Sequence, residues 1–211
     1  MRILIVDDHA IVRRGLAQIL LDAFDGVFRH DEAKDGQEAY AKVVDHNFDL
    51  VLMDISLPGR NGLEVLKQLK QIKPQLPVLM LSMHPEEQYA VRALKAGAAG
   101  YLTKGSAPDE LVAAVRRVLQ GGKYVSSTLS ELLVSELANG MQCKERHETL
   151  SDREFQVGCR IASGKTITEI ATDLVLSAKT VSTYRTRILE KMQMKSNAEI
   201  TTYFIRNGLV D

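Results

Sequence analysis

Several features are scarce in this sequence, and each scarcity excludes a class of protein. The only cysteines are Cys143 and Cys159, without CxxC spacing, so neither a zinc site nor a disulfide framework is expected. No apolar run approaches the ~18 residues of a membrane span. Residues 1–4 also lead into charge too soon for a signal peptide. We therefore expect a protein of a reducing compartment, cytoplasmic and without a membrane partner.

A net charge is also lacking, because the 27 basic side chains equal the 27 acidic ones. The overall charge therefore indicates no partner. The 211 residues, 45% of them hydrophobic, are enough for one large or two ordinary soluble domains. Charge is uneven locally, since residues 177–195 carry five lysines and arginines against Glu190 alone. This is a modest positive footprint rather than a polybasic tail.

Short apolar segments alternate with amphipathic ones over residues 1–122. The apolar segments predict strands at 2–6, 27–31, 50–53, 77–81 and 99–102. The intervening segments have helical spacing, with Asp35 and Asn61 as N-terminal caps and Pro108 in a first turn. Five strands alternating with five helices predict an α/β fold with a doubly wound, five-stranded parallel sheet.

Polar side chains stand where the predicted strands end. Asp7 and Asp8 follow the first strand, Asp54 the third, Ser82 the fourth and Lys104 the fifth. Because parallel strands end at one edge of a sheet, we expect these side chains to lie together. Asp54 considered alone could equally cap the next helix. Three carboxylates, a hydroxyl and a lysine at one edge are not explained by capping.

The chemistry of this cluster favours a phosphoryl group. Converging carboxylates repel one another unless a hard cation such as Mg²⁺ lies among them. Lys104 and Ser82 would supply a positive charge and a hydrogen-bond donor to a phosphoryl group, which an aspartate can accept as an acyl phosphate. No GxxxxGK[ST] or GxGxxG loop is present. We therefore expect a covalently carried phosphate rather than a bound nucleotide.

These residues, together with Leu57-Pro58-Gly59 and the run from Ala98 to Leu102, resemble the receiver domain of bacterial two-component response regulators over residues 1 to about 122. The resemblance implies that Asp54 is the phosphoacceptor. It implies that Mg²⁺ is bound directly by Asp8, Asp54 and the main-chain carbonyl of Ser56, with Asp7 acting through water.

By the same resemblance, Lys104 contacts the phosphoryl group, and Ser82 and Tyr101 form a switch pair. The Ser82 hydroxyl moves to the phosphoryl group, and the Tyr101 ring rotates into the vacated space. Receivers often carry a proline after the lysine, whereas Gly105 stands here. The usual cis peptide bond would cost about 3 kcal/mol at a non-proline residue.

Residues 123–149 change in character and predict a linker. One amphipathic helix is expected after Ser126-Ser127, with its apolar side formed by Leu129, Leu132, Leu133 and Leu137. The polar segment 139–148 predicts a hinge or tether. A charged surface loop within one domain is the alternative.

Residues 150–211 predict a small all-α unit. Ser151, Thr166 and Ser196 each precede a glutamate by three residues, as in capping boxes, and Ser177 is a plain N-cap. Four helices follow, at about 152–163, 167–173, 178–193 and 197–206. A short helix, a tight turn and a longer basic helix predict a helix-turn-helix.

The longer helix combines small hydroxyls with long cations, which suits contact with DNA bases and phosphates. Val181, Ile188 and Met192 are expected to face inward. We predict DNA contacts from the remaining side of the helix, at Lys179, Thr180, Ser182, Thr183, Arg185, Thr186, Arg187 and Lys191. An ordinary solvated charged face is the alternative.

The sequence motifs of this unit are similar to those of the LuxR-type DNA-binding domain. The motifs that carry the resemblance are Leu150-Ser151-x-Arg153-Glu154, Glu169-Ile170-Ala171 and Leu176-Ser177-x-x-Thr180-Val181. The whole chain thus resembles a NarL/FixJ-type response regulator. The resemblance implies that 178–193 is the recognition helix in the major groove, and that the last helix, with Ile200 and Phe204, forms a homodimer over two half-sites.

The leading hypothesis is a transcription regulator that receives a phosphoryl group from a sensor histidine kinase or phosphotransfer protein and turns over no substrate of its own. Its two domains would separate, or two copies would align on DNA. The second hypothesis, a phosphatase or dehalogenase, would require a second acid at the position of Ser56. The third, a ligand-sensing regulator, would require an aromatic-lined pocket, yet aromatic residues are 5% of the chain and tryptophan is absent. The fourth hypothesis is a receiver whose phosphorylation is vestigial.

Overall fold

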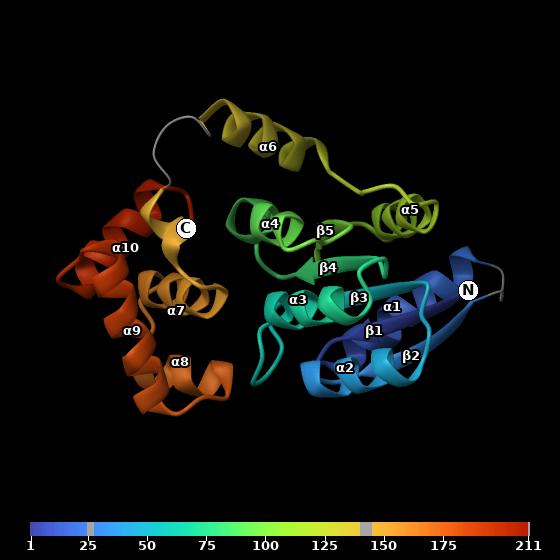
Figure 1. Cartoon of the computed structure of the whole chain (residues 1–211), viewed down its shortest axis with the longest axis horizontal. Coiled ribbons are helices and arrows are strands. Elements are labelled where there is room, and N and C mark those ends of the chain that lie inside the picture. Colours follow the sequence, from blue (N-terminus) through green and yellow to red (C-terminus); the bar gives the residue numbers. More distant parts are fainter. Residues whose placement is uncertain (25–27, 140–144, 211) are drawn as a thin grey trace. The chain divides into compact units, whose positions relative to one another are not determined.

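The chain divides into two units, Met1–Ser130 and Glu131–Asp211. The computed structural model describes residues 1–24, 28–139 and 145–210, and Figure 1 shows their helices and strands. The start of the predicted second strand, residue 27, and part of the predicted tether, 140–144, lie outside the described residues. The first unit includes residues 123–130, which the sequence assigned to the linker.

The described residues of the first unit form five strands: β1 (Arg2–Val6), β2 (Arg29–Ala33), β3 (Leu50–Asp54), β4 (Val78–Ser82) and β5 (Gly100–Thr103). All neighbours pair in parallel, in the order β2-β1-β3-β4-β5. The predicted parallel sheet is therefore confirmed. The second strand lies two residues later than predicted, because this edge strand carries polar, partly exposed residues and has no clear apolar pattern.

Helices cover both faces of the sheet. They are α1 (Ala10–Ala23), α2 (Gly36–Asp45), α3 (Gly62–Ile72), α4 (Glu86–Lys95) and α5 (Pro108–Leu119). The predicted caps of α2 and α3 are present, with the Asp35 and Asn61 side chains accepting backbone N–H bonds. The returning bond of Glu38 goes to the Lys34 N–H rather than to that of Asp35, so a reciprocal capping box is not formed there.

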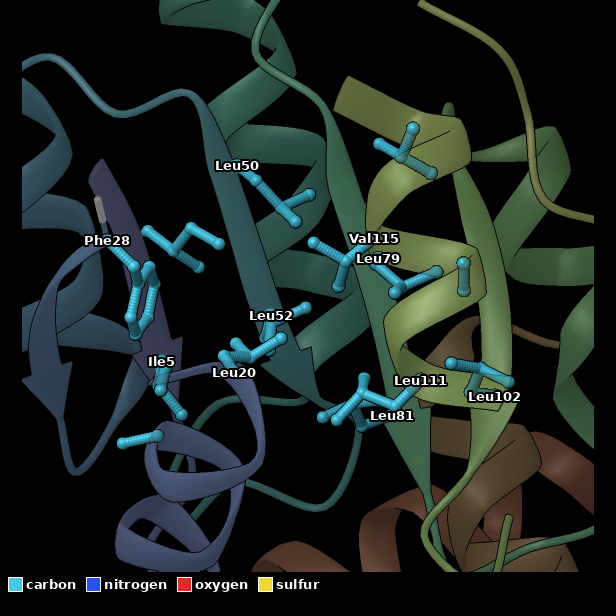
Figure 2. Close-up of a cluster of buried hydrophobic side chains, with 14 residues drawn as sticks. Ile5, Leu20, Phe28, Leu50, Leu52, Leu79, Leu81, Leu102, Leu111 and Val115 are labelled. Atoms are coloured by element: carbon cyan, nitrogen blue, oxygen red, sulfur yellow. The ribbon is translucent and has the colours of Figure 1, made fainter. Parts of the chain in front are cut away.

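The core shows why the strand sequences are continuously apolar. Alternate strand residues, among them Ile5, Leu52, Leu79 and Leu102, pack on one face against α1 and α5 (Figure 2). The intervening residues, such as Met53, are also buried. Both faces of the central strands are thus covered, which removes the polar alternation of a half-exposed sheet. The burial of both faces holds the strand ends in fixed positions.

The strand order places a switch point between β1 and β3. From β1 the chain runs outward to β2 and then returns to the other side of β1 as β3. Loops at such a point diverge and leave a crevice at the carboxyl edge of the sheet. Asp7 follows β1 directly, and Asp54 is the last residue of β3. The two acids therefore stand at the position where this topology forms a binding site.

The second unit contains a short 3₁₀ helix, η1 (Arg146–Thr149), and α7 (Asp152–Ala162), α8 (Ile167–Leu174), α9 (Ala178–Met192) and α10 (Asn197–Arg206). The four predicted helices are thus present, close to their predicted limits. Helix α6 (Ser127–Asn139) spans the division between the units.

Capping boxes begin α7 and α8, at Ser151 and Thr166. Ser196 caps α10, but the Glu199 carboxylate there accepts the N–H of Lys195 instead of that of Ser196. The third predicted box is therefore a one-way cap. Among the residues that the structure describes, no helix has the length and apolar character needed to cross a membrane.

Candidate functional site

Asp54 lies at the carboxyl edge of the sheet with only 1% of its surface exposed. Its Oδ2 atom is 2.8 Å from Lys104 Nζ, and its Oδ1 accepts the Ser56 N–H at 3.2 Å. The side chain does not accept from the first turn of the following helix, whose cap is Asn61. The reading of Asp54 as a helix cap is therefore wrong.

Lys104 joins the ends of β1 and β3. Its Nζ lies 2.6 Å from Asp7 Oδ2 as well as 2.8 Å from Asp54 Oδ2. The lysine itself is held where β5 ends, because its N–H donates to the Ser82 carbonyl at 2.6 Å. No cis peptide bond occurs among the described residues, so Lys104–Gly105 is trans. Three strand ends thus deliver one cation to two carboxylates.

Burial controls the protonation of this pair. Burial raises the pKa of Asp54 above its ordinary value, and Asp7 adds to this rise, although Lys104 opposes it. Burial alone would lower the pKa of Lys104, but the Asp54 and Asp7 carboxylates outweigh it and raise that pKa. The lysine therefore stays charged, and its charge favours the ionised, nucleophilic form of Asp54.

A divalent cation fits the residues on the β1 side. Oxygen or nitrogen atoms of Asp7, Asp8 and His9 lie within 4.8 Å of one another. The His9 Nδ1 atom is 2.8 Å from Asp8 Oδ1 and 3.3 Å from Asp7 Oδ1. Carboxylate oxygens are the ligands that Mg²⁺ prefers. The acidic pocket is thus compatible with a hard cation held beside Asp54.

His9 and Arg13 belong to the site but were not predicted. The Arg13 guanidinium donates to the main-chain carbonyl of Asp7 at 2.8 Å and pairs with Glu32 on β2 at 2.6 Å. It thereby fixes the end of β1. His9 could have been found from its position beside the acids. Arg13 could not, because its partner is brought near only by strand pairing.

Ser82 and Tyr101 lie on neighbouring strands and contact the same loop. Ser82 Oγ accepts the His84 N–H at 3.0 Å. The buried Tyr101 donates its hydroxyl to the carbonyls of His84 at 2.8 Å and Pro85 at 3.4 Å. Burial raises the pKa of Tyr101, so this hydroxyl remains a donor. The predicted switch pair therefore holds the loop between β4 and α4.

Helix α9 has a buried apolar face and an exposed polar face, as expected. Val181, Ile188 and Met192 have no exposed surface and face the core of the second unit. Ser182, Thr183, Thr186, Arg187 and Lys179 are exposed. The Thr183 and Thr186 hydroxyls donate to helix carbonyls of Lys179 and Ser182 and keep free acceptor lone pairs.

Two of the predicted contact cations have partners within the unit. Lys191 pairs with Glu154 of α7 at 2.6 Å, and Arg185 Nε donates to Asn197 Oδ1 of α10 at 2.6 Å. Arg185 is thereby held through one nitrogen, with its terminal amino groups left to bind elsewhere. Among the described residues, the Lys179 and Arg187 side chains have no ion-pair or hydrogen-bond partner.

The predicted dimer contacts on α10 require correction. Ile200 and Phe204 have no exposed surface. The Phe204 ring lies 5.7 Å from that of Phe155, and a side chain at Gly158 would collide with it. Both residues stabilise the unit itself, because their spacing places them on the face toward α7. The exposed side of α10 includes Ile205, at 50% exposure.

The doubly wound fold, the acidic pocket at its switch point and the helix-turn-helix unit together define a two-part response regulator. Residues 3–116 match the family described as response regulator receiver domain. Residues 148–204 match the family described as bacterial regulatory proteins, luxR family. The chain belongs to the response regulators of the NarL/FixJ type.

Known relatives cover the whole chain. Response regulator GacA of Pseudomonas viridiflava is 37% identical over 100% of this chain and 98% of its own length. Response regulator UvrY of Escherichia coli K12 is 36% identical over 98% of this chain and 94% of its own.

A solved structure of RcsB from Salmonella enterica serovar Typhimurium is also similar. It is 26% identical, covers 96% of this chain and 97% of its own, and has a TM-score of 0.63. That RcsB structure is bound to promoter rprA in the presence of the phosphomimetic BeF3−.

Proposed function

We propose that this protein is a DNA-binding transcription regulator of a two-component phosphorelay, switched by phosphorylation of Asp54. The observation that carries the proposal is the position of Lys104 Nζ, 2.6 Å from Asp7 and 2.8 Å from Asp54 at the sheet edge. A partly buried lysine between two carboxylates supplies the charge that a new phosphoryl group requires. The helix-turn-helix unit supplies an output for that group.

The donor is a phosphohistidine of a sensor kinase or phosphotransfer protein. An Asp54 carboxylate oxygen forms a bond to phosphorus, and the P–N bond breaks with its electron pair returning to the histidine ring. Lys104, already beside Asp54, pairs with the phosphoryl oxygens. The Ser82 hydroxyl donates to one of them. The product is an acyl phosphate on this chain, so no separate substrate is turned over.

Asp8, Asp54 and the main-chain carbonyl of Ser56 would hold Mg²⁺, with Asp7 acting through water. The ion would neutralise charge on the transferring group. The oxygen donors of the acidic pocket support this assignment, and His9 adds a nitrogen beside Asp8.

The output is a change in DNA binding by the second unit. We assign α9 to the major groove, with Lys179 and Arg187 binding phosphates and Arg185 oriented by Asn197. The structure of RcsB bound to promoter rprA supports this mode of binding. Two copies would bind as a homodimer through the exposed side of α10 over two half-sites.

Mass spectrometry tests the phosphoacceptor. We expect acetyl phosphate and Mg²⁺ to add one phosphoryl mass to the full-length protein, and Asp54→Asn to abolish the addition. Asp49→Asn, at an exposed acid before β3, is the matched control and should label normally. Labelling that survives Asp54→Asn would refute the assignment.

A further inference from the structure

The segment that follows α5 lies along the free edge of the sheet. Tyr124 N–H donates to the Ala99 carbonyl at 2.8 Å, and Tyr124 pairs with Gly100 in a parallel bridge. Gly100 permits this approach, because a Cβ there would lie 2.7 Å from the Tyr124 carbonyl oxygen. Residues 123–126, here called the strap, therefore continue the sheet beyond β5.

Two hydroxyl groups fasten the strap to two different helices. The Tyr124 hydroxyl donates to Glu110 of α5 at 2.8 Å. The Ser126 hydroxyl donates to the Glu86 carboxylate of α4. Ser126 Oγ also accepts the Leu129 N–H at 3.0 Å, so the same oxygen caps the first turn of α6. Ser126 thus joins the start of α4 to the start of α6.

Glu86 stands immediately after the loop that the switch pair holds. Tyr101 donates to the carbonyls of His84 and Pro85, and Ser82 accepts the His84 N–H. Glu86 is the next residue and the first of α4. A displacement of this loop would therefore move Glu86 directly, because Glu86 follows the loop in the chain.

The two fastenings differ in what they can transmit. Tyr124 is anchored to α5, which bears neither member of the switch pair. Burial, and secondly the hydrogen bond to Glu110, raise the pKa of Tyr124 to about 12. This hydroxyl therefore stays a donor at ordinary pH. Ser126 is anchored to α4, beside the switched loop. One end of the strap is thus bonded to α5, and the other to the helix that begins directly after the loop.

We propose that the Ser126–Glu86 hydrogen bond couples the receiver switch to the connector helix α6. When the Ser82 hydroxyl turns toward a phosphoryl group on Asp54, the His84 N–H loses its acceptor and the loop shifts. Glu86 then leaves Ser126, and the first turn of α6 loosens. Ser126 is a positioning residue in this scheme, which rests on the proposed phosphorylation of Asp54.

Hydrogen exchange in the full-length protein tests the coupling. With acetyl phosphate and Mg²⁺, we expect exchange to change in residues 83–87 and to rise about fivefold at the Leu129 amide, the factor expected for one lost hydrogen bond. In Ser126→Ala the Leu129 amide exchanges fast from the start and gains no further rise. Ser126→Thr, which keeps the hydroxyl, should restore the response.

Ser130→Ala is the matched control, because the Ser130 hydroxyl lies in the same turn but donates to the Ser126 carbonyl rather than to Glu86. It should respond like the wild type. A phosphorylated wild type whose residues 83–87 respond while Leu129 does not would overturn the coupling alone. The same holds if Ser126→Ala responds fully. Absence of a phosphoryl mass on the wild type would overturn the proposed function and the coupling together.

Discussion

Val175 occupies a backbone conformation that valine rarely adopts. It ends α8 in the turn of the helix-turn-helix with φ 53° and ψ 50°. A β-branched side chain in this left-handed region is a genuine outlier, because its Cβ crowds the adjacent carbonyl. The side chain is 66% exposed and contributes little packing to offset the strain.

Replacing Val175 with asparagine should therefore stabilise the protein. Asparagine tolerates the left-handed region, so we expect Val175→Asn to raise the free energy of unfolding by about 1 kcal/mol. Urea unfolding of the full chain measures this. Gln193, at φ 55° after α9, is a matched control, since it is unbranched and Gln193→Asn should gain less. A lower midpoint for Val175→Asn would show that the valine is needed for packing.

The sequence predicted that Asp7, Asp54 and Lys104 meet, from their positions after strands. This was possible because buried strands appear in the sequence as short apolar runs, and because parallel strands end at one edge of the sheet. It did not identify Arg13, because the position of its side chain depends on an ion pair with Glu32 of a different strand. Nor did it give the role of Lys191, which depends on Glu154 in another helix.

At the scale of elements, α7 and α9 are joined by the ion pair of Glu154 and Lys191. The Glu154 side chain is 3% exposed and that of Lys191 41% exposed. Burial alone would raise the pKa of Glu154, but hydrogen bonds from Lys191 and Ser151 outweigh it and lower that pKa below 4.5. The folded state therefore favours the ionised carboxylate more than the unfolded state does.

This difference predicts a pH dependence of stability. A carboxyl group with a lowered folded pKa stabilises the protein fully above its unfolded pKa, and the contribution is lost as pH falls through the folded value. Glu154→Gln should cost about 1 kcal/mol at pH 7, and the difference from the wild type should shrink below pH 4.5. Urea unfolding at several pH values measures it. A difference that is constant with pH would exclude the ion pair as its source.

At the scale of the whole molecule, the equal numbers of acids and bases give no general attraction to DNA. Attraction must come from the local cations of 177–195, where Glu190 is the only acid. Binding to phosphates releases counterions, so the dependence of affinity on salt counts the contacts.

Arg187→Ala should weaken binding to double-stranded DNA and reduce the slope of log affinity against log salt by about 1. Fluorescence anisotropy with a mixed-sequence duplex at several salt concentrations measures both quantities. Arg29→Ala removes the same charge from an exposed position on the first unit and should change neither. An unchanged slope for Arg187→Ala would mean that α9 presents only a solvated face.

The sequence by itself determined the parallel α/β fold, the helices of the second unit and the meeting of Asp7, Asp54 and Lys104. These follow from local periodicity, caps and strand ends, which depend on neighbours along the chain. Tertiary structure alone decided that Ile200 and Phe204 belong to the core, since a helix pattern shows an apolar face without showing what covers it. It also decided that Ser126 meets Glu86, forty residues away, because only the folded sheet brings the strap beside α4.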